Sequence, residues 1–191
     1  TITRLAPDTY FVLSAGSAER RDEDNLRKSL RDDDRVEIAN VTDDRGCLVL
    51  TGPRSREILG RLTNADLSNA AFPWLSAQDI VVGGIPVRAL RVSYAGELGW
   101  ELHHAVGETK ALYDKLIEAG KEAGLKDFGF YALNALRMEK AYRGFGTELM
   151  NEVTPLEAGM ERFVDFKKDF VGKKAVIKLR DGKPRWRLVY L

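Results

Sequence analysis

Residues 94–101 read YAGELGWE, and this stretch carries the strongest information on fold and site. Gly96 and Gly99 bracket the carboxylate of Glu97, and Glu101 lies seven residues beyond Tyr94. Glycines at these positions would let the backbone turn sharply or approach a ligand closely. A carboxylate fixed beside such a turn suits a ligand edge with two neighbouring N–H donors, because both oxygens can accept together. The spacing alone also fits a hairpin with exposed acidic residues, so both interpretations stay open.

The segments around this stretch predict strands followed by helices. Residues 80–82 and 85–92 are predicted as a hairpin that runs into the YAGELGWE stretch. A helix is expected from about Glu108, and another over residues 131–142. A short helix is expected at 172–178 and a final strand is expected at the C-terminal end, at residues 186–191. In the first of these helices, the side chains expected to point inward are Leu112, Leu116 and Ile117.

The first part of the chain predicts a hairpin and a charged helix. Residues 1–5 and 9–13 are predicted as strands around a turn, because apolar and polar residues alternate there and Pro and Asp lie between them. Ser17 is the expected N-cap of a helix that ends near Asp32.

A second strand pair is expected next. Residues 36–41 and 47–50 flank a turn-forming stretch, and Gly52 and Pro53 then end the strand and begin a helix. Strands and helices in this order predict an α+β fold with mainly antiparallel sheets and packed helices. The expected division is a first subdomain over 1–75, a second over 76–150 that holds the YAGELGWE stretch, and a segment over 151–191 that packs back and precedes a C-terminal domain.

Composition excludes several classes of function. The 191 residues carry a formal net charge of +1, so nothing draws the chain as a whole to nucleic acid or to an anionic membrane. No apolar stretch approaches the roughly 20 residues of a membrane-spanning helix. The sequence also contains no dinucleotide-binding glycine motif, P-loop, zinc-protease motif or nucleophile elbow.

The cysteine and histidines predict no metal site. Cys47 is the only cysteine, which excludes an internal disulfide, and its apolar surroundings favour a buried structural thiol over a nucleophile. His103 and His104 are adjacent, and adjacent strand residues point to opposite faces, so they make a poor metal pair.

Five motifs in one order resemble the glycine-cleavage T-protein (aminomethyltransferase) family. Residues 94–101 are similar to its Y-x-G-E-x-G-[YW]-E signature. The resemblance is strongest to the folate-binding domain of dimethylglycine and sarcosine dehydrogenases, because Leu133 and Asn134 stand where T-proteins tend to have Arg-Asp. The other four motifs are LTGPRSR at 50–56, LRMEKAYRG at 136–144, TPLEAG at 154–159 and FVGK at 170–173.

The resemblance implies a partial T-protein-like fold that binds tetrahydrofolate. Glu101 would hold the pterin, whose 2-amino group and ring N–H form a paired-donor edge, and Tyr94 would pack on the folate or hydrogen-bond to it. Arg137 is a further candidate for folate binding, although a surface or ion-paired role is as open. Tyr94 could equally be an ordinary tyrosine at a strand end, and Trp100 is expected in the core with Leu98 and Leu102.

The resemblance also implies what the whole enzyme would do. A flavin (FAD) domain on the N-terminal side would oxidise a methylated glycine, and this region would form 5,10-methylenetetrahydrofolate. The catalytic residue is unknown within the chain, because the family's Asp is expected just upstream of Thr1. The chain is therefore expected to be a fragment that is inactive alone. The location implied is the cytoplasm in a bacterium or the mitochondrial matrix in a eukaryote.

Three alternatives stay open. The chain could belong to a stand-alone aminomethyltransferase or related demethylase, to a non-catalytic folate-binding module, or to a structural interaction domain.

Overall fold

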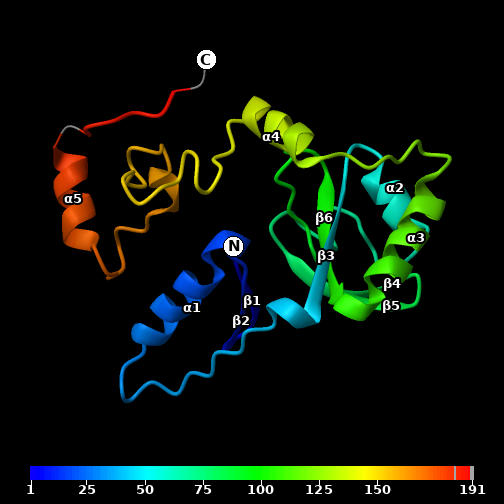
Figure 1. Ribbon diagram of the computed structural model, residues 1–191, viewed down its shortest axis with the longest axis horizontal. Helices are drawn as coiled ribbons and strands as arrows, with labels where there is room; N and C mark the ends of the chain where they lie inside the picture. Colours follow the sequence, from blue (N-terminus) through cyan, green and yellow to red (C-terminus); the bar gives the residue numbers. More distant parts are fainter. Residues whose placement is uncertain (183, 190–191) are drawn as a thin grey trace. The chain divides into compact units, whose positions relative to one another are not determined.

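A four-stranded antiparallel sheet with strand order β3-β6-β5-β4 organises residues 45–105 of the computed structural model, which describes residues 1–182 and 184–189 (Figure 1). The edge strand β3 pairs with β6 over seven consecutive residue pairs, from Arg45↔Ala105 to Thr51↔Gly99. The α+β class expected from the sequence is therefore confirmed. The sheet strands are β3 (Arg45–Thr51), β4 (Ala77–Val82), β5 (Ile85–Leu90) and β6 (Gly99–Ala105).

The chain divides into two units, unit 1 over Thr1–Leu133 and unit 2 over Asn134–Leu191. This division differs from the boundaries expected near residues 75 and 150. The physical reason is β3, which belongs to the first expected subdomain but pairs along its whole length with β6 of the second. Backbone pairing of this kind makes one cooperative layer from both stretches.

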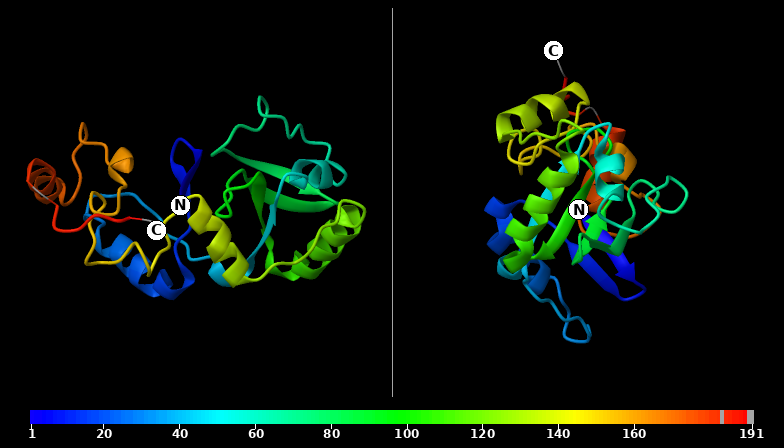
Figure 2. Two further views of the ribbon diagram at one scale, coloured as in Figure 1. Left: turned by 90° about the horizontal axis from the view of Figure 1, so that it is seen from above. Right: turned by 90° about the vertical axis from the view of Figure 1, so that its right-hand side faces the viewer.

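One face of the sheet holds the core of unit 1. Trp100, Leu102 and His104 alternate along β6 and are fully buried on this inner face. The helices α2 (Ser55–Gly60) and α3 (Thr109–Gly120) cover it (Figures 1 and 2). The inward positions expected on α3 are confirmed for Leu112 and Leu116, which are buried. Burial of such side chains stabilises the fold by about 1.5–3 kcal/mol each.

The hairpin β1 (Ile2–Ala6) and β2 (Thr9–Val12) forms where the sequence predicts it. Its Phe11 ring meets the His103 ring edge-on at a centroid distance of 5.3 Å. His103 alternates with the inner-face residues of β6, so the hairpin contacts the opposite, outer face of the sheet. The outer face is therefore partly covered near His103.

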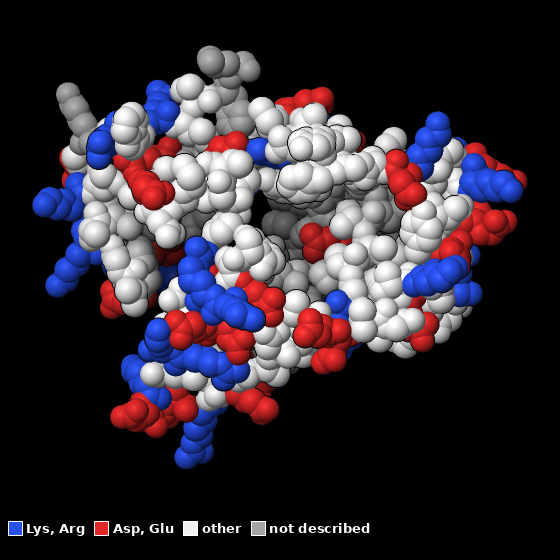
Figure 3. Space-filling view, in the orientation of Figure 1, with Lys and Arg blue, Asp and Glu red and all other residues white. Residues whose placement is uncertain are grey.

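The helix α1 (Glu19–Lys28) differs from its prediction at both ends. Ser17 lies in the short 3₁₀ turn η1 (Gly16–Ala18) instead of capping the helix, and no side chain caps α1. No residue of α1 is buried, and its positive and negative side chains are interspersed on the visible face (Figure 3). Ion pairs four residues apart, such as Arg27–Glu23 at 2.8 Å, support an exposed helix of this kind.

The prediction of a strand over residues 36–41 is wrong. Side chains hold this segment to α1 instead, because Asn40 donates to both Glu19 and Glu23 at 2.9 Å and Arg27 donates to the Ile38 carbonyl at 3.0 Å. The expected partner strand β3 pairs with β6 instead. Two further 3₁₀ turns, η2 (Thr42–Asp44) and η3 (Val106–Glu108), precede β3 and α3.

The helix α4 (Phe130–Glu139) ends three residues earlier than expected. Ala141 adopts a left-handed φ of 54°, which ends a helix. Unit 2 continues through η4 (Glu161–Phe163) and α5 (Lys173–Asp181). Residues 186–189 form no strand, contrary to expectation, and residues 190 and 191 lie outside the described part. Within the described residues, helices are too short or too polar to span a bilayer.

Candidate functional site

The carbonyl of Leu98 joins two of the sequence motifs. It accepts hydrogen bonds from the Gly52 amide at 2.8 Å, the Ser55 hydroxyl at 3.0 Å and the Thr51 hydroxyl at 3.3 Å. Ser55 is almost fully buried, so its hydroxyl needs this partner. The Thr51 hydroxyl also lies 3.0 Å from that of Ser93. The start of α2 therefore fixes the end of the YAGELGWE stretch, a link that motif order does not reveal.

The two glycines of the stretch serve different purposes. Gly96 has a φ of 76° in the turn, a region that favours glycine. Gly99 lies at the start of β6 outside the left-handed region. A Cβ on Gly99 would sit 2.7 Å from the Leu50 carbonyl oxygen and 3.0 Å from the Thr51 Cα. Gly99 is thus required for close approach of two strands.

Glu101 lies on the outer face of β6, opposite Val49 in the register with β3. Its side chain is 25% exposed, and its Oε2 lies 3.1 Å from the Nε2 of His103. Its Oε1 accepts no hydrogen bond from the residues that the structure describes. Val49 beside it is half exposed, so an apolar surface adjoins the carboxylate. Glu101 can therefore accept hydrogen bonds from an incoming group.

Cys47 lies close to Glu101 and His103. Its Sγ is 3.8 Å from the Nε2 of His103, its cross-strand neighbour. Cys47 is exposed as a residue, which corrects the expectation of a buried thiol. Partial burial of the sulfur, together with the negative charge of Glu101, raises the pKa of the thiol to about 12. A protonated thiol is a poor nucleophile, so this pKa supports the expectation against nucleophilic chemistry, which stays a prediction.

His103 and His104 point to opposite faces. His104 is fully buried on the inner side, where its Nδ1 lies 2.8 Å from the Leu102 carbonyl oxygen and its Nε2 lies 2.9 Å from the Thr109 hydroxyl. His103 instead faces Cys47 and Glu101. The two histidines therefore make no pair, as alternation along a strand predicts.

Trp100 lies in the core with Leu102, as predicted, and two arginines lie near its ring. The Arg56 and Arg91 guanidinium carbons are 6.0 Å and 5.9 Å from its ring. Both arginines donate to the same oxygen of Asn69, at 2.7 Å and 2.8 Å. Burial, and then the charge of Arg56, lowers the pKa of Arg91. The sequence does not predict this assembly, because no spacing rule connects residues so far apart.

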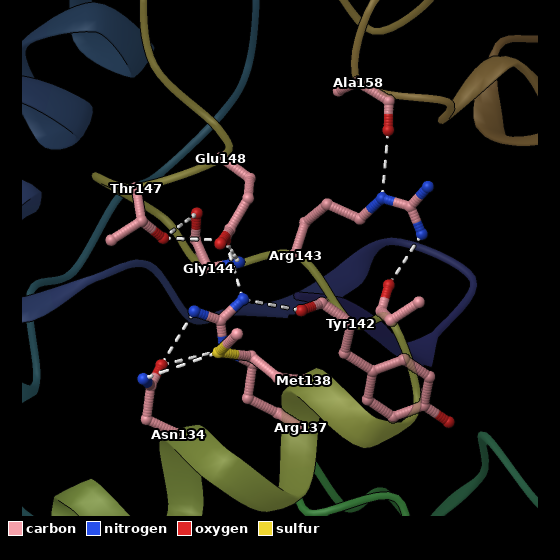
Figure 4. A network of polar contacts seen from close by, with 10 residues as sticks. Asn134, Arg137, Met138, Tyr142, Arg143, Gly144, Thr147, Glu148 and Ala158 are labelled. Carbon is pink, nitrogen blue, oxygen red and sulfur yellow. Dashed lines mark hydrogen bonds and ion pairs between the residues drawn. The ribbon is translucent and has the colours of Figure 1, made fainter. Parts of the chain in front are cut away.

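Tyr94 and Arg137, the other two candidates, lie in different surroundings. Tyr94 is 39% exposed and precedes the Gly96 turn in unit 1. Arg137 is only 3% exposed and lies on α4 within unit 2. Its guanidinium donates to Asn134 Oδ1 at 2.7 and 2.9 Å, to the Tyr142 carbonyl at 2.9 Å and to Glu148 at 2.7 Å (Figure 4). The position of Asn134, which separates this chain from the T-protein pattern, thus provides an acceptor for Arg137.

Glu148 is the charge partner of Arg137. Burial by itself would raise its pKa, but hydrogen bonds from Arg137, the Thr147 hydroxyl and the Gly144 amide lower the pKa to about 2. Arg143 lies beyond the end of α4 and donates to the Ala158 and Ala141 carbonyls at 2.9 and 2.7 Å (Figure 4).

Glu157, in the TPLEAG motif, has a structural role. It accepts from the Thr154 amide at 3.0 Å and hydroxyl at 2.8 Å, while its own amide donates back to the Thr154 hydroxyl at 3.3 Å. This reciprocal pair is a capping box. The amide of Thr154, followed by its hydroxyl, lowers the pKa of Glu157.

Residues 1–168 match the family described as GCVT N-terminal domain. The chain belongs to this family. The resemblance found in the five motifs is therefore confirmed, and the relatives include dimethylglycine and sarcosine dehydrogenases as well as aminomethyltransferases.

Three curated relatives illustrate the range of the family. The mitochondrial dimethylglycine dehydrogenase of Homo sapiens is 42% identical over 100% of this chain and 22% of its own length. The mitochondrial sarcosine dehydrogenase of Mus musculus is 34% identical, with the same two coverages. The aminomethyltransferase of Alkaliphilus metalliredigens is 38% identical over 94% of this chain and 48% of its own length. The chain thus spans about a fifth of the dehydrogenases and about half of the aminomethyltransferase.

A solved structure shares the fold. The heterotetrameric sarcosine oxidase from Corynebacterium sp. U-96, in complex with pyrrole 2-carboxylate, superposes with a TM-score of 0.54. The match covers 67% of this chain and 63% of that chain at 22% sequence identity.

Proposed function

We propose that this GCVT N-terminal domain binds tetrahydrofolate and serves one-carbon transfer in an enzyme of the dimethylglycine or sarcosine dehydrogenase type, with 5,10-methylenetetrahydrofolate as product. The observation that carries the proposal is Glu101, a partly exposed carboxylate held at the end of the family's signature stretch. The relatives named dehydrogenases support the enzyme type.

The geometry of Glu101 fits a reduced pterin. Oε2 lies beside His103, and Oε1 accepts no hydrogen bond from described residues, so it can take an N–H of the ligand. The half-exposed Val49 lies directly opposite in the strand register and offers an apolar surface to a flat ring. The Leu98 anchor keeps the start of β6 fixed, so little freedom is lost when the ligand binds.

Tyr94 and Arg137 belong to the proposal in different ways. Tyr94, which is 39% exposed at the turn, would pack on the folate or hydrogen-bond to it. Arg137 stays a prediction, because its guanidinium already donates to Asn134, Tyr142 and Glu148. To bind folate, Arg137 would have to give up one of these hydrogen bonds and donate to the ligand instead.

The main contribution of the site to the reaction would be to position the bound tetrahydrofolate. When bound, tetrahydrofolate supplies the amine that captures a one-carbon unit at the oxidation level of formaldehyde. The residues of this chain would orient the ligand through Glu101 and exclude water from it. Oxidation of the methylated glycine is assigned to a flavin domain elsewhere in the polypeptide, in a mitochondrial or bacterial enzyme.

The proposal is tested with the full-length protein. Calorimetry should detect tetrahydrofolate binding, and turnover of dimethylglycine or sarcosine with an electron acceptor should yield 5,10-methylenetetrahydrofolate in place of free formaldehyde. Binding without transfer would favour a non-catalytic folate module. No binding of any reduced folate would contradict the proposal.

A stand-alone aminomethyltransferase is the second candidate, favoured by the 38% identity to a relative of which the chain spans 48%. The same assay separates the two. An aminomethyltransferase would bind tetrahydrofolate but would pass no electrons from a methylated glycine to the acceptor.

A further inference from the structure

Three different metal-binding side chains meet on the outer face of the sheet. The Cys47 sulfur, a Glu101 oxygen and the His103 ring nitrogen all lie within 4.8 Å of one another. They come from the two strands β3 and β6, with Cys47 directly opposite His103 and Glu101 two positions along the same face. We propose that these three residues form a binding site for a divalent transition metal of the zinc class.

The donor separations match a tetrahedral centre. With zinc–ligand lengths of about 2.0–2.3 Å, two nitrogen or oxygen ligands lie about 3.3 Å apart and a sulfur–nitrogen pair lies about 3.6 Å apart. The His103 Nε2 is 3.1 Å from the Glu101 oxygen and 3.8 Å from the Cys47 sulfur. These two separations are within a few tenths of an ångström of the ideal values, and the third, between the Cys47 sulfur and the Glu101 oxygen, is at most 4.8 Å and must close by side-chain rotation.

The ligand set also fits the zinc class chemically. Thiolate, imidazole and carboxylate together favour zinc over calcium or magnesium, which prefer oxygen alone. The Nε2 of His103 lies near both the Cys47 sulfur and the Glu101 carboxylate, and a proton on Nε2 can form a good hydrogen bond to only one of them. A bound cation could be coordinated by the nitrogen, the sulfur and the carboxylate together.

The surroundings leave room for the ion's charge and for a fourth ligand. Arg88, the other cross-strand neighbour of His103, directs its guanidinium to both oxygens of Asp79 at 2.8 and 2.9 Å. Cys47 is exposed and Glu101 is partly exposed, so water can occupy the fourth position. Three protein ligands and one water is the pattern of open zinc sites. The thiol must lose its proton to the solvent when the metal binds, which weakens the site relative to a preformed thiolate site.

The site has a consequence that rests on the proposed function. A metal bound through Glu101 would occupy the carboxylate that is proposed to hold the pterin. Zinc and a reduced folate should then compete, so the metal would regulate folate binding.

The test titrates Co²⁺ into the reduced full-length protein without folate. Co²⁺ should produce a sulfur-to-cobalt charge-transfer band in the difference spectrum, and Zn²⁺ should displace it. The Cys47→Ser variant should lose this band, and Glu101→Gln should weaken Co²⁺ binding at least tenfold. The matched control is Glu122→Gln, which removes a carboxylate that is 86% exposed in the same unit and should change nothing.

Two results would overturn the metal site. One is the absence of the charge-transfer band at saturating Co²⁺ in protein whose circular dichroism shows it to be folded. The other is an identical band in folded Cys47→Ser protein, which would place the ion on a cysteine of the full-length protein outside these 191 residues. Failure of tetrahydrofolate to bind would instead contradict the proposed function and leave the cobalt result intact. If folate binds and Zn²⁺ does not raise its apparent Kd, the regulatory consequence is wrong.

Discussion

Two acidic side chains, Glu148 of unit 2 and Glu101 of unit 1, differ in how fully their oxygens are hydrogen-bonded. In residues 137–148 of unit 2, Glu148 accepts from Arg137, Thr147 and the Gly144 amide, and Arg137 donates to three partners in turn. In residues 94–101 of unit 1, backbone groups are tightly bound at Leu98, whereas Glu101 keeps one oxygen without a partner among the described residues. A saturated carboxylate stabilises the fold, and an unsaturated one on a fixed strand can bind a ligand.

The largest effect is expected from breaking the saturated pair. Replacing Glu148 with Gln leaves the buried Arg137 without a compensating charge and should reduce the free energy of unfolding by about 3–5 kcal/mol. Urea unfolding measures this, and Glu152→Gln, an exposed acid four residues away, is the control. A loss below about 1 kcal/mol would show that Arg137 is not a structural cation.

Acid should remove the same contribution. Because the pKa of Glu148 is lowered from 4.5 to about 2 in the folded state, its stabilisation is complete above pH 4.5 and is lost as the pH falls toward 2. The stability gap between the wild type and Glu148→Gln should therefore narrow between about pH 5 and about pH 3. A gap that stays constant over this range would contradict the assigned pKa.

A smaller loss is expected at the junction of β3 and β6. Gly99→Ala places a methyl group 2.7 Å from the Leu50 carbonyl oxygen, and it should cost about 1–3 kcal/mol as the two strands separate. Gly107→Ala is the matched control, because a Cβ there meets nothing within 4 Å. Equal stability of the two variants would mean that the close approach is not required.

The smallest effect concerns the turn. Gly96→Ala should cost about 1 kcal/mol, because its φ of 76° disfavours a side chain. Thermal unfolding would register this as a modest fall in Tm. No fall, or a rise, would show that the turn relaxes to another conformation without strain.

Local patterns predicted much of the fold correctly. The hairpin β1–β2, the pair β4–β5 and the inward face of α3 follow from alternation and helical spacing. The pairing of β3 with β6 could not be predicted in this way, because the sequence pattern of a strand does not show which strand it pairs with. The sequence pattern of residues 36–41 predicts a partner strand for β3, but Asn40 instead holds this segment to α1. Propensity contains no information of this long-range kind.

The site was predicted unevenly for the same reason. Motif order predicted Glu101, Tyr94 and Gly96 as residues of the site, but it could not show that Cys47 lies opposite His103. Nor could it show that Asn134 provides an acceptor for Arg137, although the departure from the T-protein pattern at Asn134 was a usable signal. Both facts depend on which segments meet in space.

The most direct measurement replaces each of the two acidic residues with Gln in turn and records tetrahydrofolate binding and stability in the full-length protein. Glu101→Gln should weaken tetrahydrofolate binding by about 1.5–3 kcal/mol, the range for a hydrogen bond to a charged group, and should leave the free energy of unfolding nearly unchanged. Glu148→Gln should lower stability and leave the affinity of the folded protein nearly unchanged. If calorimetry finds the wild-type Kd in folded Glu101→Gln protein, Glu101 does not hold the pterin and the account of this site is wrong.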